Sequence, residues 1–513
     1  MSAPNGTNTR ESRRVVISGA GPAGLLLAGL LLARNNEPGT VTYEVTLLDG
    51  REDYGSISKE DLVKNHRSWM LALAEYGMDA IKTLPELYHE YVKGEGVKVT
   101  EFDIYLGKKK ISLGTESSAS KLKSSSDNDG GLPESFIIDR NFIVAALARY
   151  VKETHEEDVN YTPLYRTKCQ YVDYENNQVL IRNVETKAET YISYDLLVGC
   201  DGVRSTVREA LIKRHSNFQC DITDIFQEFK QTHLDMPEKF SKGTLSALPD
   251  IFPYCQGIAL PETGGKVNID IGISRNNFDK LPEELKSDDY KVVSNYAKEN
   301  FKAFELVDYD DFGRQWVGQR WNQSGMVHCN FYHSLQTGVV IMGDAAHATS
   351  PSIGMGMNTA LRDAQVFSEI LKESKDDFTL ALPAFSEARV KEGNALSDLA
   401  MHLYCMDKKQ QTKETLHMIL RTFLHKKLPK VVSDHPQNMV IGRRGVSLAE
   451  VYDQTVKLGI MPKHRAINDK IRVEYFEQKA GMVQMTEERS MGTKFVVGAG
   501  LVAAAAVTYQ TYI

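Results

Sequence analysis

Residues 15–24 read VVISGAGPAG, and an apolar run over residues 25–32 follows them directly. The first four residues are typical of a buried strand, and Gly19, Gly21 and Gly24 then stand at G-x-G-x-x-G spacing before a predicted helix. The first glycine permits a tight turn, the second lets a pyrophosphate approach the backbone, and the third lets helix and strand pack closely. The free N–H groups of the helix and the positive end of its dipole would face the phosphates. The stretch therefore predicts a dinucleotide-binding turn, with a glycine-rich packing turn as the alternative.

A second strand is predicted over residues 43–48, and it ends at Asp49. A carboxylate at this position can accept hydrogen bonds from both hydroxyls of an adenosine ribose. Arg51 follows in a charged turn, where it can reach a second phosphate or the ribityl region of a cofactor; the alternative is a solvated loop charge. The strand before the glycines, the helix after them and the acid that closes the next strand together favour nucleotide binding.

The composition is that of an ordinary globular protein, with 513 residues of which 42% are hydrophobic and 25% charged. This length predicts about two to three domains, or one large α/β body with insertions. The net charge of −7 argues against nucleic acid as the main partner. Six scattered cysteines show no paired spacing, so we expect a reducing compartment and neither a disulfide framework nor a metal site.

The C-terminal stretch, residues 495–513 (FVVGAGLVAAAAVTYQTYI), carries no charge. As a helix it would reach ~28 Å, which is enough to span a bilayer core. Lys494 flanks the stretch, and tyrosines lie near its end, where interfacial aromatic side chains are favoured. We expect a membrane anchor here, with a buried C-terminal helix as the alternative.

Two further turns follow predicted buried strands. Residues 194–200 form one such strand, which runs into Asp201 and Gly202. Residues 337–342 form another, which runs through a glycine into Asp344. Each of these turns, like the first one, places polar or flexible residues at the end of a buried strand.

The chain offers two more candidates for contact with an anion. A flexible turn containing Gly354 and Gly356 precedes a helix predicted from Asn358 onward, so backbone N–H groups there can meet anionic or carbonyl oxygens. Arg140 lies in the first turn of another predicted helix, which Asp139 is placed to cap. Since the helix dipole disfavours a cation at that end, an arginine there suggests a nearby anion.

In combination, these motifs resemble those of the FAD-dependent group A aromatic hydroxylases (the para-hydroxybenzoate hydroxylase superfamily) over nearly all of residues 14–400. The resemblance implies that the first glycine-rich turn binds the FAD diphosphate, that Asp49 binds the ribose and that Asp344 holds the ribityl chain. It places Arg140 beside the flavin, and it assigns Asp201 and Gly202 to FAD and NADPH handling. The complete predicted cofactor site is Gly19, Gly21, Gly24, Asp49, Arg51, Arg140, Asp201, Gly202, Asp344, Gly354, Gly356 and Asn358.

Within that superfamily the chain resembles the kynurenine 3-monooxygenase group in residues 49–53 (DGRED), 339–363 and 395–401. The apolar tail fits as well, since members of that group in animals and fungi are anchored to the mitochondrial outer membrane. We therefore expect a membrane-associated protein whose catalytic body lies in the cytoplasm, at the mitochondrial outer membrane or the endoplasmic reticulum.

The chain departs from that group on the substrate side. The arginine that holds the substrate carboxylate there falls near Thr100 in this chain, with Lys98 as the only nearby cation. Met355 stands where the group carries glutamine, while Tyr404 remains, and both are candidates for lining the substrate side. Because an unpaired buried ion is very costly, a substrate less polar than kynurenine is at least as well matched.

The resemblance implies an enzyme in which NADPH reduces FAD, the reduced flavin captures O2, and a flavin C4a-hydroperoxide transfers one oxygen atom to a small organic, aromatic substrate. The flavin carries this chemistry, so no side chain is assigned as catalytic; His347 is expected to satisfy a backbone carbonyl. Two other functions stay open: a membrane-associated epoxidase of a lipophilic alkene, and a non-catalytic flavin-fold binding protein. A flavin-dependent halogenase is disfavoured because the three tryptophans form no paired motif.

The predicted fold class is α/β: a Rossmann-like FAD-binding domain with an inserted β-rich substrate domain and a helical C-terminal region that ends in the apolar tail. Residues 67–92 are predicted to be helical. The predicted division of the chain is 14–216 (first FAD-binding part, with a mobile polar loop at 115–131), 217–335 (β-rich substrate domain), 336–400 (second FAD-binding part), 401–490 (helical region) and 495–513 (anchor).

Overall fold

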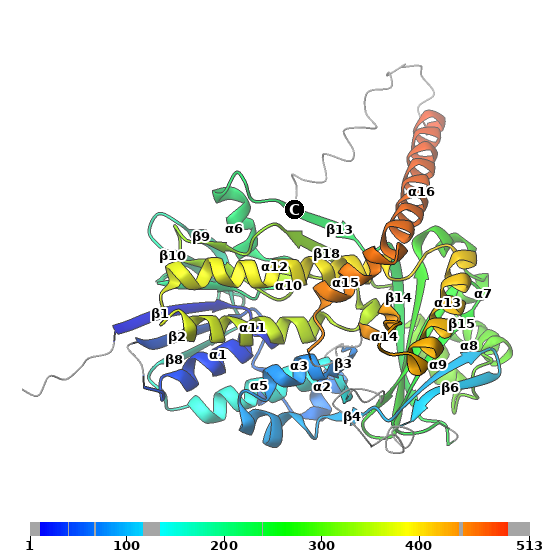
Figure 1. Cartoon of the computed structure of the whole chain (residues 1–513), viewed down its shortest axis with the longest axis horizontal. Coiled ribbons are helices and arrows are strands. Elements are labelled where there is room, and N and C mark those ends of the chain that lie inside the picture. Colours follow the sequence, from blue (N-terminus) through cyan, green and yellow to red (C-terminus); the bar gives the residue numbers. More distant parts are fainter. Residues whose placement is uncertain are drawn as a thin grey trace, which may run out of the picture.

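A sheet of six strands forms the centre of one half of the molecule (Figure 1). Its strand order is β19 (His333–Ser334), β20 (Val339–Ile341), β12 (Leu196–Gly199), β1 (Glu11–Ser18), β2 (Val41–Asp49) and β8 (Tyr161–Tyr165). All neighbours pair in parallel except β19 with β20. The three strands that lead into the predicted motifs, β1, β12 and β20, are therefore adjacent, and their carboxyl ends meet at one edge of the sheet.

The computed structural model describes residues 11–38, 41–65, 68–115, 134–238, 240–440 and 445–490. The predicted mobile loop beyond residue 115 and the predicted anchor at 495–513 lie outside these residues. Among the residues that are described, no helix has both the length and the apolar character needed to cross a membrane.

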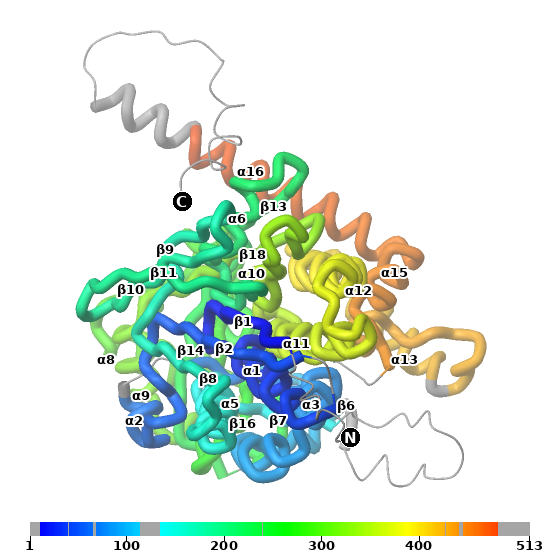
Figure 2. Tube along the Cα trace, turned by 90° about the vertical axis from the view of Figure 1, so that its left-hand side faces the viewer, coloured from blue at the N-terminus to red at the C-terminus, as the bar shows by residue number. Residues whose placement is uncertain are grey.

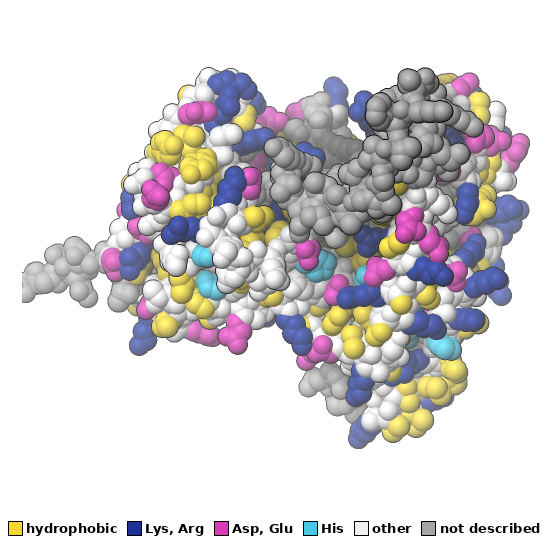
Figure 3. All heavy atoms as spheres, turned by 90° about the horizontal axis from the view of Figure 1, so that it is seen from above, with side chains coloured by type: hydrophobic (Ala, Val, Ile, Leu, Met, Phe, Trp, Pro, Cys, Tyr) yellow, Lys and Arg dark blue, Asp and Glu magenta, His cyan; other side chains and the backbone are white. Residues whose placement is uncertain are grey.

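On the face seen in Figure 3, basic and acidic side chains are interspersed.

Helices cover the central sheet. α1 (Pro22–Arg34) contacts α5 (Arg140–His155) and α11 (Gly356–Glu373), and its residues 23–32 are all buried because neighbours surround it (Figure 2). α6 (Thr206–Arg214) packs against β12 and β20 and against a small sheet of β9 (Thr167–Asp173), β10 (Gln178–Asn183) and β11 (Glu189–Ser193). The apolar run after the glycines thus becomes the core of the nucleotide-binding half, as the sequence predicts.

A second six-stranded sheet forms the other half. Its order is β14 (Gln227–Asp235), β17 (Lys266–Ser274), β16 (Cys255–Glu262), β15 (Thr244–Phe252), β5 (Glu101–Leu106) and β6 (Lys109–Thr115). Helices α8 (Tyr290–Asn300) and α9 (Tyr309–Val317) contribute to an apolar core with one face of this sheet. β5 pairs in parallel with β15, so the hairpin at residues 101–115 joins this sheet, although the predicted division places it with residues 14–216.

A small three-stranded sheet lies between the two halves: β3 (Met70–Ala74), β7 (Ser135–Asp139) and β4 (Gly96–Lys98). The helical prediction for residues 67–92 is wrong at β3, which pairs with β7. The sequence MLALA favours a helix locally, and this distant pairing overrides that preference. Helix α3 (Glu75–Ile81) follows β3.

The C-terminal region is helical, as predicted. It contains α12 (Phe378–His402), α13 (Lys408–Lys427), α15 (Leu448–Lys457) and α16 (Ile460–Ser490). α12 contacts both α11 and α15, and this links the helical region to the nucleotide-binding half.

Candidate functional site

The first and second turns touch each other. Gly19 has a φ of +111°, and a Cβ atom on it would lie 2.2 Å from the carbonyl oxygen of Cys200. The Gly19 N–H donates to the carbonyl oxygen of Leu48 at 2.7 Å. Glycine is required here for both the conformation and the close approach, and this packing places the turn after β1 beside Asp201.

The third turn touches the first helix. Gly343 has a φ of +60°, and a Cβ atom on it would lie 3.5 Å from the side chain of Ala23 in α1. The turns after β1, β12 and β20 thus converge, as their strand order requires. Gly24 packs inward, where a Cβ atom would lie 2.0 Å from the carbonyl oxygen of Gly19. Gly21 differs from these, since apart from its neighbours in the chain no atom lies within 4 Å of the position that a Cβ atom on it would take. The turn therefore has an open side at Gly21, where a diphosphate can approach the backbone.

Asp49 accepts hydrogen bonds from the first glycine-rich turn and from Arg51. Its Oδ2 accepts from the N–H of Ala20 at 2.8 Å, and both of its oxygens accept from the Arg51 side chain. Burial tends to raise the pKa of Asp49, but the hydrogen bonds and charge of Arg51 outweigh it and hold that pKa below its usual value. Arg51 also lies over the ring of Tyr54. In this structure the guanidinium of Arg51 pairs with Asp49, and the contact of Arg51 with a phosphate stays a prediction.

A narrow hollow opens beside this pair at the side of α1 and α5. Apolar, aromatic and charged side chains line it: Ala20, Leu25, Asp49, Arg51, Glu52, Tyr54, Val144, Ala148 and Tyr165. An adenosine group needs such a mixture, with apolar walls for the base and a carboxylate for the ribose. The side chains around this hollow are of the kinds that an adenosine group contacts.

Asp201 closes the second turn. Its Oδ2 accepts from the N–H groups of Thr206 and Val207 at 2.8 and 3.3 Å, at the start of α6. Its Oδ1 is buried, has no hydrogen-bond partner among the described residues, and belongs to a carboxyl whose pKa burial raises. A buried acceptor without a donor is costly, so this oxygen suits a ligand that brings a hydroxyl or an N–H group. Gly202 next to it has a φ of +81° and open space at its Cβ position.

Two charged residues that are predicted to contact the cofactor are exposed, and each is the first residue of a helix. Asp344 is the first residue of the short helix α10 (Asp344–His347), directly after Gly343. Arg140 is the first residue of α5, and its side chain is exposed. Asp139 caps α5, as predicted, by accepting from the N–H groups of Asn141 and Phe142. Both charged side chains are thus accessible, and their contacts with the cofactor stay predictions.

The glycine-rich turn before α11 is held by Asn358. Gly354 has a φ of +66°, and α11 begins at Gly356, two residues before the predicted start. The buried amide of Asn358 accepts from the N–H of Ala74 at 2.9 Å and donates to the carbonyl oxygens of Ala72 and Gly354. Its hydrogen-bonding groups are already used. Asn358 is therefore placed to position the turn relative to β3 rather than to bind a cofactor through its side chain.

The two candidates for the substrate side lie at the ends of two helices: Met355 directly precedes α11, and Tyr404 follows α12. Met355 is buried in an apolar cluster with Leu396, Leu399 and Leu403. Tyr404 follows α12, and its side chain is partly exposed. Their contact with a substrate stays a prediction.

The sequence reasoning missed a buried ionic cluster beneath the third turn. The Asp363 carboxylate in α11 is fully buried; it accepts from the Gly343 N–H at 2.8 Å, lies 2.6 Å from Nε2 of His347, and accepts from Nε of Arg389 at 2.7 Å. The expectation that His347 satisfies a backbone carbonyl is corrected, since its partner is this carboxylate. Nη1 of Arg389 also donates a hydrogen bond to the hydroxyl of Tyr76 at 3.2 Å. The cluster holds the Gly343 turn against α11 through the hydrogen bond from the Gly343 N–H to Asp363. A charged residue on the buried face of each helix was its only sequence signal.

Asp363 gives the fold a pH dependence. Burial alone would raise its pKa, but the charges of His347 and Arg389 dominate and lower it from 3.8 to about 2. A carboxyl whose pKa is lower in the folded state stabilises the fold above its unfolded pKa. We therefore expect the free energy of unfolding to fall as the pH drops from 3.8 to about 2. Urea unfolding at a series of pH values measures this loss, which should be smaller in an Asp363→Asn variant; an equal loss in both proteins would contradict it.

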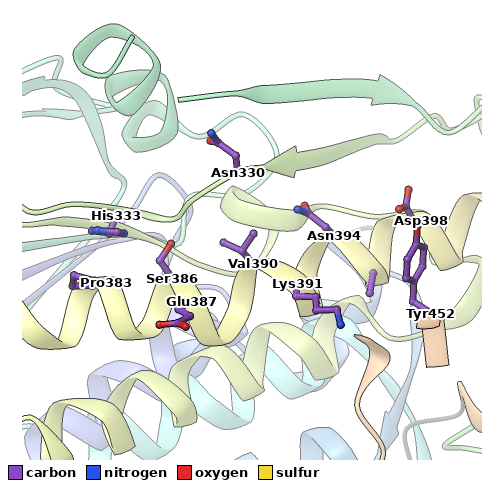
Figure 4. A pocket seen from close by; sticks show the side chains of 11 residues that line it. Asn330, His333, Pro383, Ser386, Glu387, Val390, Lys391, Asn394, Asp398 and Tyr452 are labelled. Atoms are coloured by element: carbon purple, nitrogen blue, oxygen red, sulfur yellow. The ribbon is translucent and has the colours of Figure 1, made fainter. Parts of the chain in front are cut away.

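A larger hollow of about 580 Å³ lies elsewhere, along α12 (Figure 4). Asn330 and His333 face it from one side, Ser386, Asn394 and Asp398 come from α12, and Tyr452 comes from α15. None of the predicted cofactor residues lines it. The hollow is therefore separate from the converging turns.

Comparisons with known proteins agree with the site. Residues 317–375 match the FAD binding domain family. The chain is 30% identical to kynurenine 3-monooxygenase of Sus scrofa over 42% of this chain and 44% of that one, and 26% identical to kynurenine 3-monooxygenase of Phaeosphaeria nodorum over 81% and 82%. The matched stretch thus spans less than half of the pig enzyme and four-fifths of the fungal one. These relatives favour neither the epoxidase nor the non-catalytic binding protein.

Solved structures share the fold. The chain resembles 2-methyl-3-hydroxypyridine-5-carboxylic acid oxygenase with a TM-score of 0.58 at 16% identity, covering 85% of this chain and all of the other. It resembles pqsL, described as a probable FAD-dependent monooxygenase from Pseudomonas aeruginosa, with a TM-score of 0.55 at 16% identity, covering 79% and 100%. The predicted α/β FAD-binding fold is confirmed. These findings support the resemblance to the FAD-dependent group A aromatic hydroxylases, and among them the chain is similar to the kynurenine 3-monooxygenases.

Proposed function

We propose that this protein uses FAD and NADPH to insert one oxygen atom from O2 into a small aromatic substrate that lacks the carboxylate of kynurenine. The observation that carries the FAD part is the convergence of three turns around the open side of Gly21. The substrate part rests on the groups that lie between the second sheet and the small sheet.

We assign the FAD contacts as follows. The turn at Gly19 and Gly21 binds the diphosphate through backbone N–H groups, and Asp49 binds the ribose once Arg51 gives up part of its hold. Asp201 accepts a hydrogen bond through its unpaired Oδ1, and Asp344 holds the ribityl chain. When bound, FAD supplies the redox and oxygen chemistry, and the protein's residues orient the partners and exclude water.

The face of the second sheet that meets the small sheet disfavours an anion. Leu260 forms an apolar cluster there with Met70 and Ile137 of the small sheet. On the same sheet face, burial raises the pKa of Asp270 to about 7. The neighbouring His233 opposes this rise in the pKa of Asp270, and the Glu262 carboxylate adds to it. Because His233 is already paired with Glu262 at 2.5 Å, an incoming carboxylate would meet apolar side chains and carboxyls, and pairing it would cost this existing contact.

The residue that stands where the kynurenine 3-monooxygenases carry the substrate arginine, Thr100, also disfavours a carboxylate. The hydroxyl of Thr100 donates to the carbonyl oxygen of Gly243 at 3.5 Å. A threonine engaged with the backbone brings no positive charge to a substrate carboxylate. A neutral or amine-bearing aromatic compound suits these surroundings better than an amino-acid carboxylate.

Stopped-flow reduction of the bound FAD by NADPH tests this proposal. The panel contains kynurenine, simple aromatic acids, neutral and amine-bearing aromatic compounds, and lipophilic alkenes. We expect a neutral or amine-bearing aromatic compound to accelerate the loss of flavin absorbance and to yield a hydroxylated product. A large acceleration by kynurenine would contradict the argument from Thr100, and acceleration by alkenes alone would favour an epoxidase.

We further propose that residues 495–513 anchor the protein to the mitochondrial outer membrane or the endoplasmic reticulum, with the catalytic body in the cytoplasm. The support is the uncharged length of this stretch. Deleting residues 492–513 should move the protein from the membrane fraction to the soluble fraction of a cell lysate. An unchanged distribution would contradict the anchor.

A further inference from the structure

Helix α13 presents its apolar side chains to solvent. Leu416, Ile419, Leu420 and Phe423 are 62%, 54%, 58% and 58% exposed. Their spacing of three, four and seven residues places them on one face of the helix. We call these four residues the α13 face. Leu424, Leu428 and Val431 are also exposed and extend it toward and beyond the end of the helix.

The opposite side of α13 is polar and docked onto the protein. Gln410 and Glu414 are buried there, and Glu414 lies 3.6 Å from Nζ of Lys463 in α16. Gln411 accepts from the Gln256 amide of the second sheet. The helix is thus oriented with its polar face inward and its apolar face outward, the reverse of an ordinary surface helix. Figure 2 shows α13 at the outer edge of the molecule.

The charged side chains that border the α13 face are mainly basic; Lys408 is paired with Asp250 at 2.8 Å, and Asp407 and Asp434 flank the segment. Lys408, Lys409 and Lys413 lie at one end of the helix, and Lys427 and Lys430 lie at the other. Glu414 is the only acid from residue 408 to residue 433, and it points inward. The whole chain has a net charge of −7, so this basic border is a local feature.

The charge pattern selects among possible occupants. A second copy of the chain, paired through this helix in either direction, would bring one basic end against another and would be repelled. A convex apolar helix with lysines around it matches the interface of an anionic bilayer, where apolar side chains enter the headgroup boundary and lysines meet lipid phosphates. We propose that the α13 face docks onto an anionic membrane surface, in addition to any anchoring by the C-terminal stretch.

Quenching of tryptophan fluorescence by brominated lipid tests this proposal in the full chain. It distinguishes membrane contact through α13 from membrane contact through another segment. A Phe423→Trp variant places the reporter on the α13 face, and Leu380→Trp is the matched control, because Leu380 is 60% exposed on α12. With vesicles containing brominated phosphatidylserine, we expect the added fluorescence at position 423 to be quenched and that at position 380 to be unaffected. If the reporter at position 423 stayed unquenched on vesicle-bound protein, the proposal would be overturned, because another segment would then hold the membrane.

Placing acidic side chains on the α13 face gives a second readout. Replacing Leu420 and Phe423 together by Asp should abolish the contribution of α13 to binding, lowering affinity for phosphatidylserine vesicles by roughly a hundredfold. Leu380→Asp should not change it. If the protein bound vesicles of phosphatidylcholine alone with equal affinity, the proposed contact between the lysines and anionic lipid would be contradicted. Self-association that the double variant abolishes, without lipid binding, would assign the face to a second copy.

The proposed oxygenation does not affect this test. The double variant should keep FAD and its NADPH-dependent turnover in solution, since neither residue lies at the converging turns. If Phe423→Trp were quenched by the vesicles but oxygenated no substrate with FAD and NADPH, the proposed function would fail and the membrane contact would stand.

Discussion

Gly21→Ala is expected to leave the protein folded and to remove most of its affinity for FAD. Apart from its chain neighbours, no protein atom lies within 4 Å of the Cβ position of Gly21, so the fold tolerates a methyl group there. The diphosphate must approach the backbone at this point, and the methyl group would displace it from charge-assisted hydrogen bonds. Losing one or two of these bonds predicts a dissociation constant roughly a hundredfold higher. Titration of the apoprotein with FAD, followed by flavin fluorescence, measures this change.

The chain offers a matched control at Gly94, which also has no atom within 4 Å of its Cβ position. Gly94→Ala should leave both the stability and the FAD affinity unchanged. Gly24→Ala should instead damage the fold itself, because its Cβ atom would lie 2.0 Å from a carbonyl oxygen. If Gly21→Ala bound FAD as tightly as Gly94→Ala, the diphosphate would not lie at this turn.

Asp363→Asn should be strongly destabilising. The substitution keeps the size of the side chain but leaves the guanidinium of Arg389 buried without its carboxylate at 2.7 Å. Removing one partner of a buried pair costs about 3–5 kcal/mol. The difference in the free energy of urea unfolding between the variant and the wild-type protein measures this cost.

The surface pair of Arg14 and Asp195 serves as the control, since both side chains are partly exposed and 2.8 Å apart. Asp195→Asn should cost no more than about 1 kcal/mol. Should Asp363→Asn prove too unstable to purify, adding Arg389→Gln should restore part of the stability, because the unpaired charge is then gone. A cost for Asp363→Asn as small as that for Asp195→Asn would contradict the account of the cluster.

The cofactor half of the fold could be predicted because its signals are local. The strand, the glycine turn and the apolar helix are contiguous at residues 15–32, and parallel strands place their carboxyl ends on the same edge. The placement of β3 could not be predicted, because its pairing with residues 135–139 overrides a sequence that favours a helix. The hairpin at residues 101–115 joins the second sheet through a partner about 140 residues away in the chain, and no local pattern announces such a contact.

The same distinction applies within the site. The spacing of Gly19, Gly21 and Gly24 predicts the turn, since each glycine has a steric reason at its own position. The pairing of Arg51 with Asp49 competes with the expected phosphate contact, and sequence alone does not decide between two partners of a flexible arginine. Asp363 and its partners come from three helices that only the packed fold brings together.

A crystal structure of the protein with FAD tests the central claim most directly. We predict that the diphosphate lies against the backbone at Gly21, the ribose at Asp49 and the ribityl chain at Asp344, in one continuous path across the carboxyl ends of β1, β12 and β20. FAD bound in the hollow along α12, or bound away from any one of these three turns, would contradict the account.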